Sequence, residues 1–157
     1  MTRRCVASIL AAALIAIAAP ASAGALTAET LHSYFKAAGI KTEEKDGALN
    51  FSASFPDSRA FSMMARLDPK THFLYFAVLD LAVIKEKRPS VFRKSEKASD
   101  YNYGLGLTKV EWVRDTGEVR LSQSFSTEDG FSQGAFLKTL QSLLVTAEKL
   151  APELSKL

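Results

Sequence analysis

Cysteine is almost absent from this chain of 157 residues, and the position of its single copy excludes several kinds of site. Cys5 precedes an apolar run near the start of the chain, whereas the lipidated cysteine of a lipoprotein follows the apolar region. The rest of the sequence has no thiol. Disulfides, thiolate nucleophiles and cysteine-ligated zinc or iron are therefore excluded for residues 24–157.

Histidine is the next scarce residue, with His32 and His72 as its two copies. His32 lies beside the apolar stripe of a predicted helix, and His72 lies at the start of a predicted strand. Neither spacing indicates a metal site or a Ser-His-Asp arrangement, so both are interpreted as solvated or partly packed side chains. The sequence predicts a protein that is not an enzyme and that has no cofactor and no metal.

The first 23 residues have the pattern of a secretory signal peptide. Two arginines precede an apolar run over 6–19, and an A-x-A cleavage site ends at Ala23. The run is shorter than the roughly 20 residues that a membrane-spanning helix needs. We predict cleavage after Ala23, which places a single domain over 24–157 in the periplasm or outside the cell, with no transmembrane segment.

No strong excess of charge remains once this leader is removed. The leader contains two of the 20 basic residues and none of the 17 acidic residues, so residues 24–157 have a net charge of +1. A near-neutral exported chain is a poor candidate for nucleic-acid binding, and no nucleic acid is expected as a partner. The remaining length is enough to bury one core without a covalent cross-link.

Apolar periodicity predicts the elements of the first half. A helix is expected between Thr27, a predicted N-cap, and Gly39, a predicted C-cap. A short candidate strand over 40–45 precedes the turn Asp46-Gly47, and alternating strands follow over 49–55, 61–67 and 73–79. This pattern predicts an antiparallel meander whose buried face is covered by helices.

The segment over 84–102 is rich in charge. Pro89-Ser90 indicates a helix start, and the apolar stripe that follows is thin. A solvated helix face balanced by its own glutamates explains the charges. The functional alternative is a surface for acidic lipids, a cell-wall polymer or an acidic partner. The candidate partner- or anion-binding residues are Lys85, Lys87, Arg88, Arg93, Lys94 and Lys97.

The second half has the most regular pattern. Strands alternate over 107–114 and 119–125, and a helix with apolar residues at three- and four-residue spacing follows up to Pro152. The triplet Asp115-Thr116-Gly117 between the strands matches the short aspartic-protease motif. Its single copy and its place between two strands indicate a hairpin turn instead.

Two further features are weak as functional signals. Gly104-Leu105-Gly106 lacks the third glycine and the strand-before, helix-after context of a dinucleotide-binding loop, so we interpret it as a junction. Met63, Met64 and Trp112 are side chains that can line a ligand groove. Their alternation within predicted strands favours packing in the sheet.

Two pieces of sequence accompany the element order, namely Asn102…Val113-Arg114-Asp115-Thr116-Gly117-Glu118-Val119 and Asp129-Gly130-Phe131…Phe136…Leu140…Ala147…Pro152. Together with that order they resemble the YbjN domain family. This resemblance covers nearly all of residues 24–157. It implies an antiparallel α+β domain in the order α-β-β-β-α-β-β-α, with helices on one face, similar in fold to the type III secretion chaperones. It also implies a binding or chaperone-like role, with a homodimer among the expected assemblies.

Two functions follow as hypotheses. The first is a non-catalytic periplasmic or secreted domain that binds another, unknown protein in a chaperone-like manner. The alternative is a periplasmic module that binds a small molecule or a lipid with the apolar face between sheet and helices.

Overall fold

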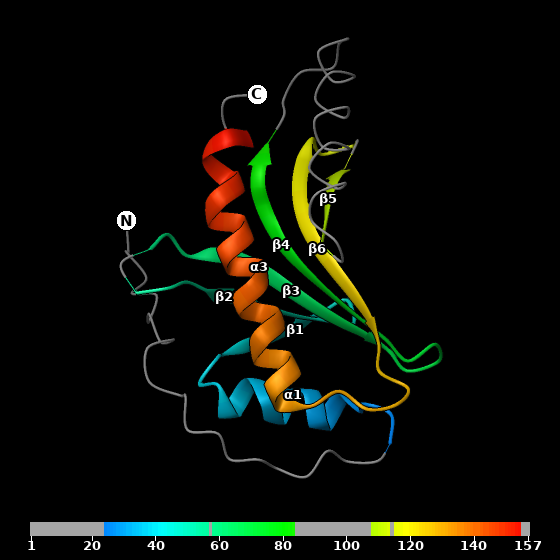
Figure 1. Cartoon of the computed structure of the whole chain (residues 1–157). Helices are drawn as coiled ribbons and strands as arrows, with labels where there is room; N and C mark the ends of the chain where they lie inside the picture. The colour runs from blue at the N-terminus through cyan, green and yellow to red at the C-terminus, as the bar shows by residue number, and fades with distance from the viewer. Residues whose placement is uncertain (1–23, 57, 84–107, 114, 155–157) are drawn as a thin grey trace.

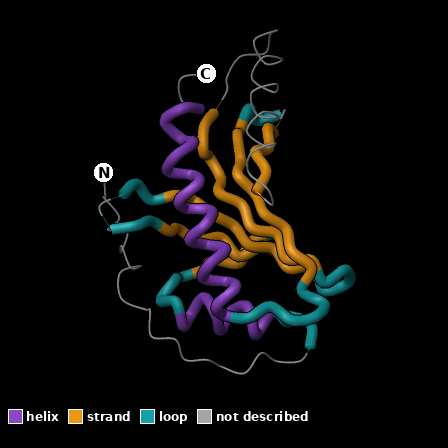
Figure 2. Tube along the Cα trace, in the orientation of Figure 1, coloured by secondary structure: helices purple, strands orange, loops and turns teal. Residues whose placement is uncertain are grey.

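The computed structural model describes residues 24–56, 58–83, 108–113 and 115–154. Within these ranges the chain forms two helices and one antiparallel sheet with the strand order β1-β2-β3-β4-β6-β5 (Figure 1, Figure 2). Both helices pack on one face of the sheet, which confirms the predicted α+β class. The elements are α1 (Ala28–Ala37), β1 (Thr42–Lys45), β2 (Ala48–Ala53), β3 (Phe61–Asp68), β4 (Phe73–Val83), β5 (Thr108–Val113), β6 (Glu118–Ser126) and α3 (Gln133–Leu154).

The described elements follow the predicted order, with four strands rather than three before the segment 84–102. The candidate strand over 40–45 is present as β1, and the strands expected on either side of the second turn are present as β5 and β6. The predicted helix over 84–102, the junction at Gly104-Leu105-Gly106 and the predicted leader lie outside the described residues.

Helix α1 begins and ends where the sequence indicates. Thr27 caps its N-terminus, because the Thr30 amide donates a hydrogen bond to Thr27 Oγ1 at 3.2 Å. At the other end Gly39 has a φ of 69°, and the amides of Gly39 and Ile40 donate to carbonyls of the last turn. This pair of bonds is a Schellman motif, which requires a left-handed residue at the position of Gly39.

The turn between β1 and β2 has two residues. Lys45 pairs with Ala48, and Asp46 and Gly47 between them have φ angles of 53° and 72°. Asp followed by Gly is the sequence preferred for a hairpin turn with two positive φ angles. The predicted turn is therefore confirmed, and it sets the register of the first hairpin.

Strand register assigns each alternate side chain to one of two faces. Phe51, Met63, Val78, Leu121 and Val110 lie in register across five strands, and all five are buried. They belong to the face covered by the helices, here called the inner face. Residues one position along each strand point the opposite way, to the outer face.

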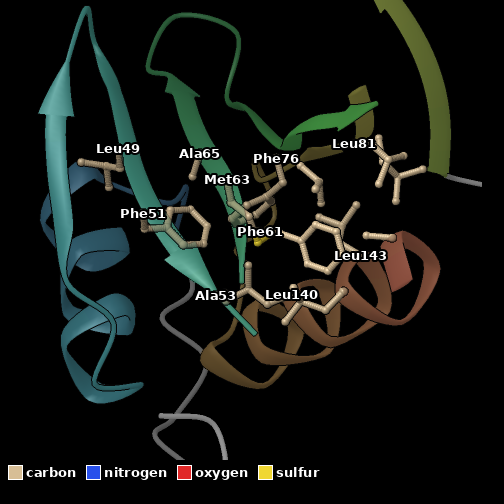
Figure 3. Close-up of a cluster of buried hydrophobic side chains, with 14 of the residues drawn as sticks. Leu49, Phe51, Ala53, Phe61, Met63, Ala65, Phe76, Leu81, Leu140 and Leu143 are labelled. Carbon is tan, nitrogen blue, oxygen red and sulfur yellow. The ribbon is translucent and has the colours of Figure 1, made fainter. Parts of the chain in front are cut away.

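Aromatic rings connect the helices to the inner face. The ring centroid of Phe35 in α1 lies 4.8 Å from that of Phe51 in β2 and 4.8 Å from that of Phe136 in α3, both edge-on. Phe136 also contacts Phe76 of β4, at 6.0 Å between centroids. In Figure 3, Leu140 of α3 points into the same cluster. The two helices and the sheet therefore share one core.

Hydrogen bonds join three connecting segments at one end of this core. Thr127, which is fully buried, donates from its amide and its hydroxyl to the carbonyl of His72, at 2.7 and 2.8 Å. The carbonyl of Thr127 accepts from the Leu26 amide at 3.3 Å. Nearby, the Tyr34 hydroxyl of α1 donates to the carbonyl of Phe131 at 2.8 Å. The N-terminal segment, the β3–β4 turn and the β6–α3 loop are thus held together.

The pairing of β4 with β6 contains a bulge. Its register shifts between Val78 and Ala82, where three residues of β4 lie opposite one residue of β6. Asp80 within the bulge has a φ of 50°, and its amide donates to Glu118 Oε1 at 3.3 Å. The carbonyl of Asp80 accepts from Arg59 Nη2 at 3.2 Å. Two side chains therefore stabilise a backbone conformation that non-glycine residues rarely adopt.

Helix α3 continues past Pro152, where the sequence pattern predicted that it would end. It extends to Leu154, with Pro152 in its last turn. Proline removes one helical hydrogen bond because it has no N–H. Ala151 and Leu154 on either side are buried in the core. Burial of this last apolar turn offsets the lost hydrogen bond.

The core packing predicts a large loss of stability when Leu140 is truncated. Leu140 is buried in the cluster beneath α3, so Leu140→Ala should lower the free energy of unfolding by about 2–5 kcal/mol. Urea denaturation followed by circular dichroism measures this loss. The matched control is Val145→Ala on the same helix, where the side chain is 53% exposed and the expected change is within about 0.5 kcal/mol. Equal losses in the two variants would contradict the described packing of α3.

Candidate binding surface

The outer face of the sheet is the surface opposite α1 and α3. It differs from the inner face in chemistry, since small polar side chains dominate on β2 and β6 and charged or aromatic side chains are frequent on β3, β4 and β5. The side chains that the register places on it include Asn50, Ser52, Ser62, Met64, Arg66, Phe73, Tyr75, Ala77, Lys109, Glu111, Arg120, Ser122 and Ser124.

A polar network crosses three strands of this face. The hydroxyl of Tyr75 in β4 donates to Glu111 Oε2 of β5 at 2.8 Å, reaching across β6. Glu111 lies directly opposite Arg120 of β6 in the register. Arg120 donates two hydrogen bonds to Glu118, at 2.8 and 2.7 Å. Glu118 also accepts the amide of Asp80, so the network extends to the bulge of β4.

These contacts shift proton equilibria away from neutral pH. Burial and the Glu111 carboxylate raise the pKa of Tyr75 to about 12. The hydrogen bonds from Arg120 hold the pKa of Glu118 below its usual value, and Glu118 in turn raises the pKa of Arg120. A general acid or base functions with a pKa near the working pH. The shifted groups of the network therefore keep one protonation state near neutral pH, as expected of side chains with a structural role.

One part of the outer face is open to solvent. Phe73 is 50% exposed, and Arg66, Ser62 and Ser124 are also exposed. Towards β5 the face is only partly covered, since Ser122 is buried but Lys109, directly opposite it on β5, is exposed. The exposed patch, as the term is used below, consists of Ser62, Met64, Arg66, Phe73, Tyr75 and Ser124.

The register gives the exposed patch a defined layout. Arg66 lies opposite Tyr75, and Tyr75 lies opposite Ser124, so these three form one row across β3, β4 and β6. Phe73 lies two positions from Tyr75 along β4, as a diagonal neighbour of Arg66. Side chains of this length can reach one another across such a diagonal. The patch thus combines arginine, aromatic and methionine side chains, the types enriched where proteins contact one another.

The six basic residues predicted as a binding surface are not among the residues that the structure describes. Lys85, Lys87, Arg88, Arg93, Lys94 and Lys97 lie outside the described residues, so the proposed anion-binding role of that segment stays a prediction.

The Asp115-Thr116-Gly117 triplet forms the turn between β5 and β6. Gly117 has a φ of 73°, and its amide donates to the Val113 carbonyl at 2.8 Å. The Glu118 amide donates to Thr116 Oγ1 at 3.3 Å. Asp115 is exposed in this turn. The structure confirms that the triplet forms the turn of the β5–β6 hairpin.

The other residues considered from the sequence lie apart from one another. His32 is exposed on α1, whereas His72 is half-buried in the β3–β4 turn with a φ of 53°. Met63 is fully packed in the core, and Trp112 is half-buried against it on the inner face. Met64 belongs to the exposed patch. Strand alternation correctly separated the two methionines, one to each face.

The described part of the chain contains neither a cluster of metal-ligating side chains nor a membrane-spanning helix. In that part, no group of three histidine, cysteine, aspartate or glutamate side chains lies close enough to hold a metal ion. Neither described helix is both long and apolar enough to cross a membrane.

Sequence reasoning did not find the polar network. Its members lie on three strands and are separated by up to 45 residues, from Tyr75 to Arg120. Alternation indicates that Glu111 and Arg120 share a face, but only the insertion of β6 between β4 and β5 brings Tyr75 to Glu111. The position of β6 in the sheet was the missing information.

Comparisons with known proteins establish the fold. No family model matches the chain, and no curated protein matches it in sequence. Among solved structures, the chain is similar to YbjN from E. coli, which is described as a candidate transcription regulator, with 16% identity and a TM-score of 0.61. The match covers 84% of this chain and 96% of that protein. The chain therefore has a YbjN-like fold, as its sequence predicted.

The raised pKa of Tyr75 predicts a pH-dependent contribution to stability. Because its pKa is about 12 in the folded chain and about 10 when unfolded, the folded state holds the phenol proton more tightly. The stabilisation is complete below pH 10 and is lost as the pH rises towards 12. Urea denaturation of the wild type and Tyr75→Phe should give a difference in unfolding free energy at pH 9 that shrinks by pH 11. A constant difference would contradict a special environment for the hydroxyl.

Proposed function

We propose that the chain is a non-catalytic protein-binding domain that is exported from the cytoplasm and contacts its partner through the exposed patch. The observation that carries this proposal is the patch itself, where Arg66 and the half-exposed Phe73 lie beside Met64 and Tyr75 on an uncovered part of the sheet. Such side chains supply most of the binding energy in protein interfaces.

A protein partner fits this surface better than the alternatives do. A small molecule or lipid bound between sheet and helices would need apolar space there. The rings of Phe35, Phe76 and Phe136 occupy that region and are at most 1% exposed. A nucleic acid would favour a continuous basic surface, whereas Glu111 and Glu118 lie beside Arg120 on the outer face.

The structural neighbour is consistent with a binding role. YbjN is described as a candidate transcription regulator, and its printed description names no reaction. The predicted likeness to the secretion chaperones and the predicted homodimer both stay predictions, and light scattering on residues 24–157 measures the second.

Among the described residues, the position of the first buried one supports the proposed cleavage after Ala23. Gly24 is exposed, and Leu26 is buried with its amide bonded to Thr127. Cleavage at the predicted site would leave this anchor intact. The described core, which extends from Leu26 to Leu154, would be complete in the mature chain.

Site-specific photo-crosslinking in the native cell tests the binding face. A photoreactive amino acid at Ser62 or Ser124 should give discrete adducts with another polypeptide, because both positions are exposed in the patch. The control position is Ser142, which is exposed on α3. Adducts of equal yield at all three positions, or none at the two patch positions, would contradict the proposal.

Expression of the full chain in a bacterium with a periplasm tests export. The protein released by osmotic shock should begin at Gly24 by N-terminal sequencing, and Ala23→Leu, which blocks the small-residue requirement of the cleavage site, should accumulate the uncleaved form. Recovery of the uncleaved wild type in the cytoplasm would show that the first 23 residues are not a cleaved leader.

A further inference from the structure

The chain is tied to the core within a few residues of the predicted cleavage site. Gly24 is exposed and Ala25 is half-buried, whereas Leu26 is only 5% exposed and belongs to the hydrophobic core. The next residue, Thr27, caps α1, so the backbone is fixed from Leu26 onward. The predicted cleavage site is therefore separated from the folded domain by Gly24 and Ala25 alone.

Hydrogen bonds connect Leu26 to the interior of the domain. Its amide donates to the carbonyl of Thr127 at 3.3 Å, and Thr127 is fully buried. Thr127 in turn donates from its amide and its hydroxyl to the carbonyl of His72, at 2.7 and 2.8 Å. Movement of Leu26 would therefore expose a leucine side chain and break a backbone hydrogen bond at the same time.

The distance between Leu26 and the bond to be cut is short for a protease. An extended chain advances at most about 3.6 Å per residue, so the Ala23–Gly24 bond lies no more than about 11 Å from the Cα atom of Leu26. A protease encloses residues on both sides of the bond that it cuts, and it cuts folded substrates where the backbone can open locally. Leader peptidases also act at the membrane surface, which brings a second barrier close to the domain.

We infer that the folded domain blocks removal of its own leader, so that cleavage after Ala23 has to precede the docking of Leu26. The inference rests on the proposed export and adds an order of events to it. Exposure of a buried leucine is unfavourable by a factor of about ten to one hundred. Cleavage of the folded precursor is slowed by the same factor, because the protease acts on the small open population.

Cleavage of the purified full chain by a bacterial leader peptidase in detergent micelles tests the inference. The variant has Gly-Ser repeated four times between Ala25 and Leu26, a flexible spacer that leaves residues 1–25 and the contacts of Leu26 unchanged. With both precursors folded, as verified by near-ultraviolet circular dichroism, the spacer variant should be cut at least about tenfold faster than the wild type. Leu26→Ala, which removes the buried side chain, should also be cut faster.

The matched control is Val145→Ala, which truncates an apolar side chain that is 53% exposed on α3 and should leave the cleavage rate unchanged. Equal rates for the wild type and the spacer variant would overturn the inference, whether the folded domain leaves the bond accessible or the leader prevents folding. Failure of the proposed export is distinguishable by N-terminal sequencing of the product. A spacer variant that is not cut after Ala23 would refute the predicted leader, and the inference with it.

Discussion

The edge-on contacts of Phe35 are the constraint on which the rest of the fold depends. Its ring touches Phe51 of the sheet and Phe136 of α3, so the short helix α1 is fixed to both other parts of the core at once. A helix of ten residues is marginal by itself in water, and packing rather than propensity must stabilise it. Because both helices meet at these rings, they must lie on the same face of the sheet.

Because both helices pack on the inner face, the outer face of the sheet is left uncovered by them. The outer face receives no described helix, so its strands carry serines, charged groups and partly exposed aromatic side chains. The network from Tyr75 to Glu118 gives part of this face a fixed arrangement, since ordering those side chains on binding has no further entropic cost. The exposed patch lies beside that fixed region. A rigid sheet with a small exposed set of anchors is suited to recognition.

Much of the fold could be predicted from the sequence because its signals are local. Gly39 and the Asp46-Gly47 pair mark a helix end and a turn through backbone angles that few residues adopt, and alternation separated Met63 from Met64. The bulge at Asp80 and the position of β6 between β4 and β5 had no local signal, since both depend on pairing between distant strands. Consequently the exposed patch, which spans β3, β4 and β6, could not be assembled from the sequence alone.

The hydrogen bonds of Thr127 also determine when the N-terminal segment can fold during synthesis of the chain. Leu26 is among the first described residues to be synthesised, yet its amide bonds to a carbonyl 101 residues later. Phe35 likewise cannot make its ring contact with Phe136 until that residue has been synthesised, late in translation. The N-terminal part of the domain therefore cannot reach its final packing while the ribosome is still making the second half. If the chain is exported as proposed, this delay leaves the N-terminal segment without its packing partners until helix α3 has been made.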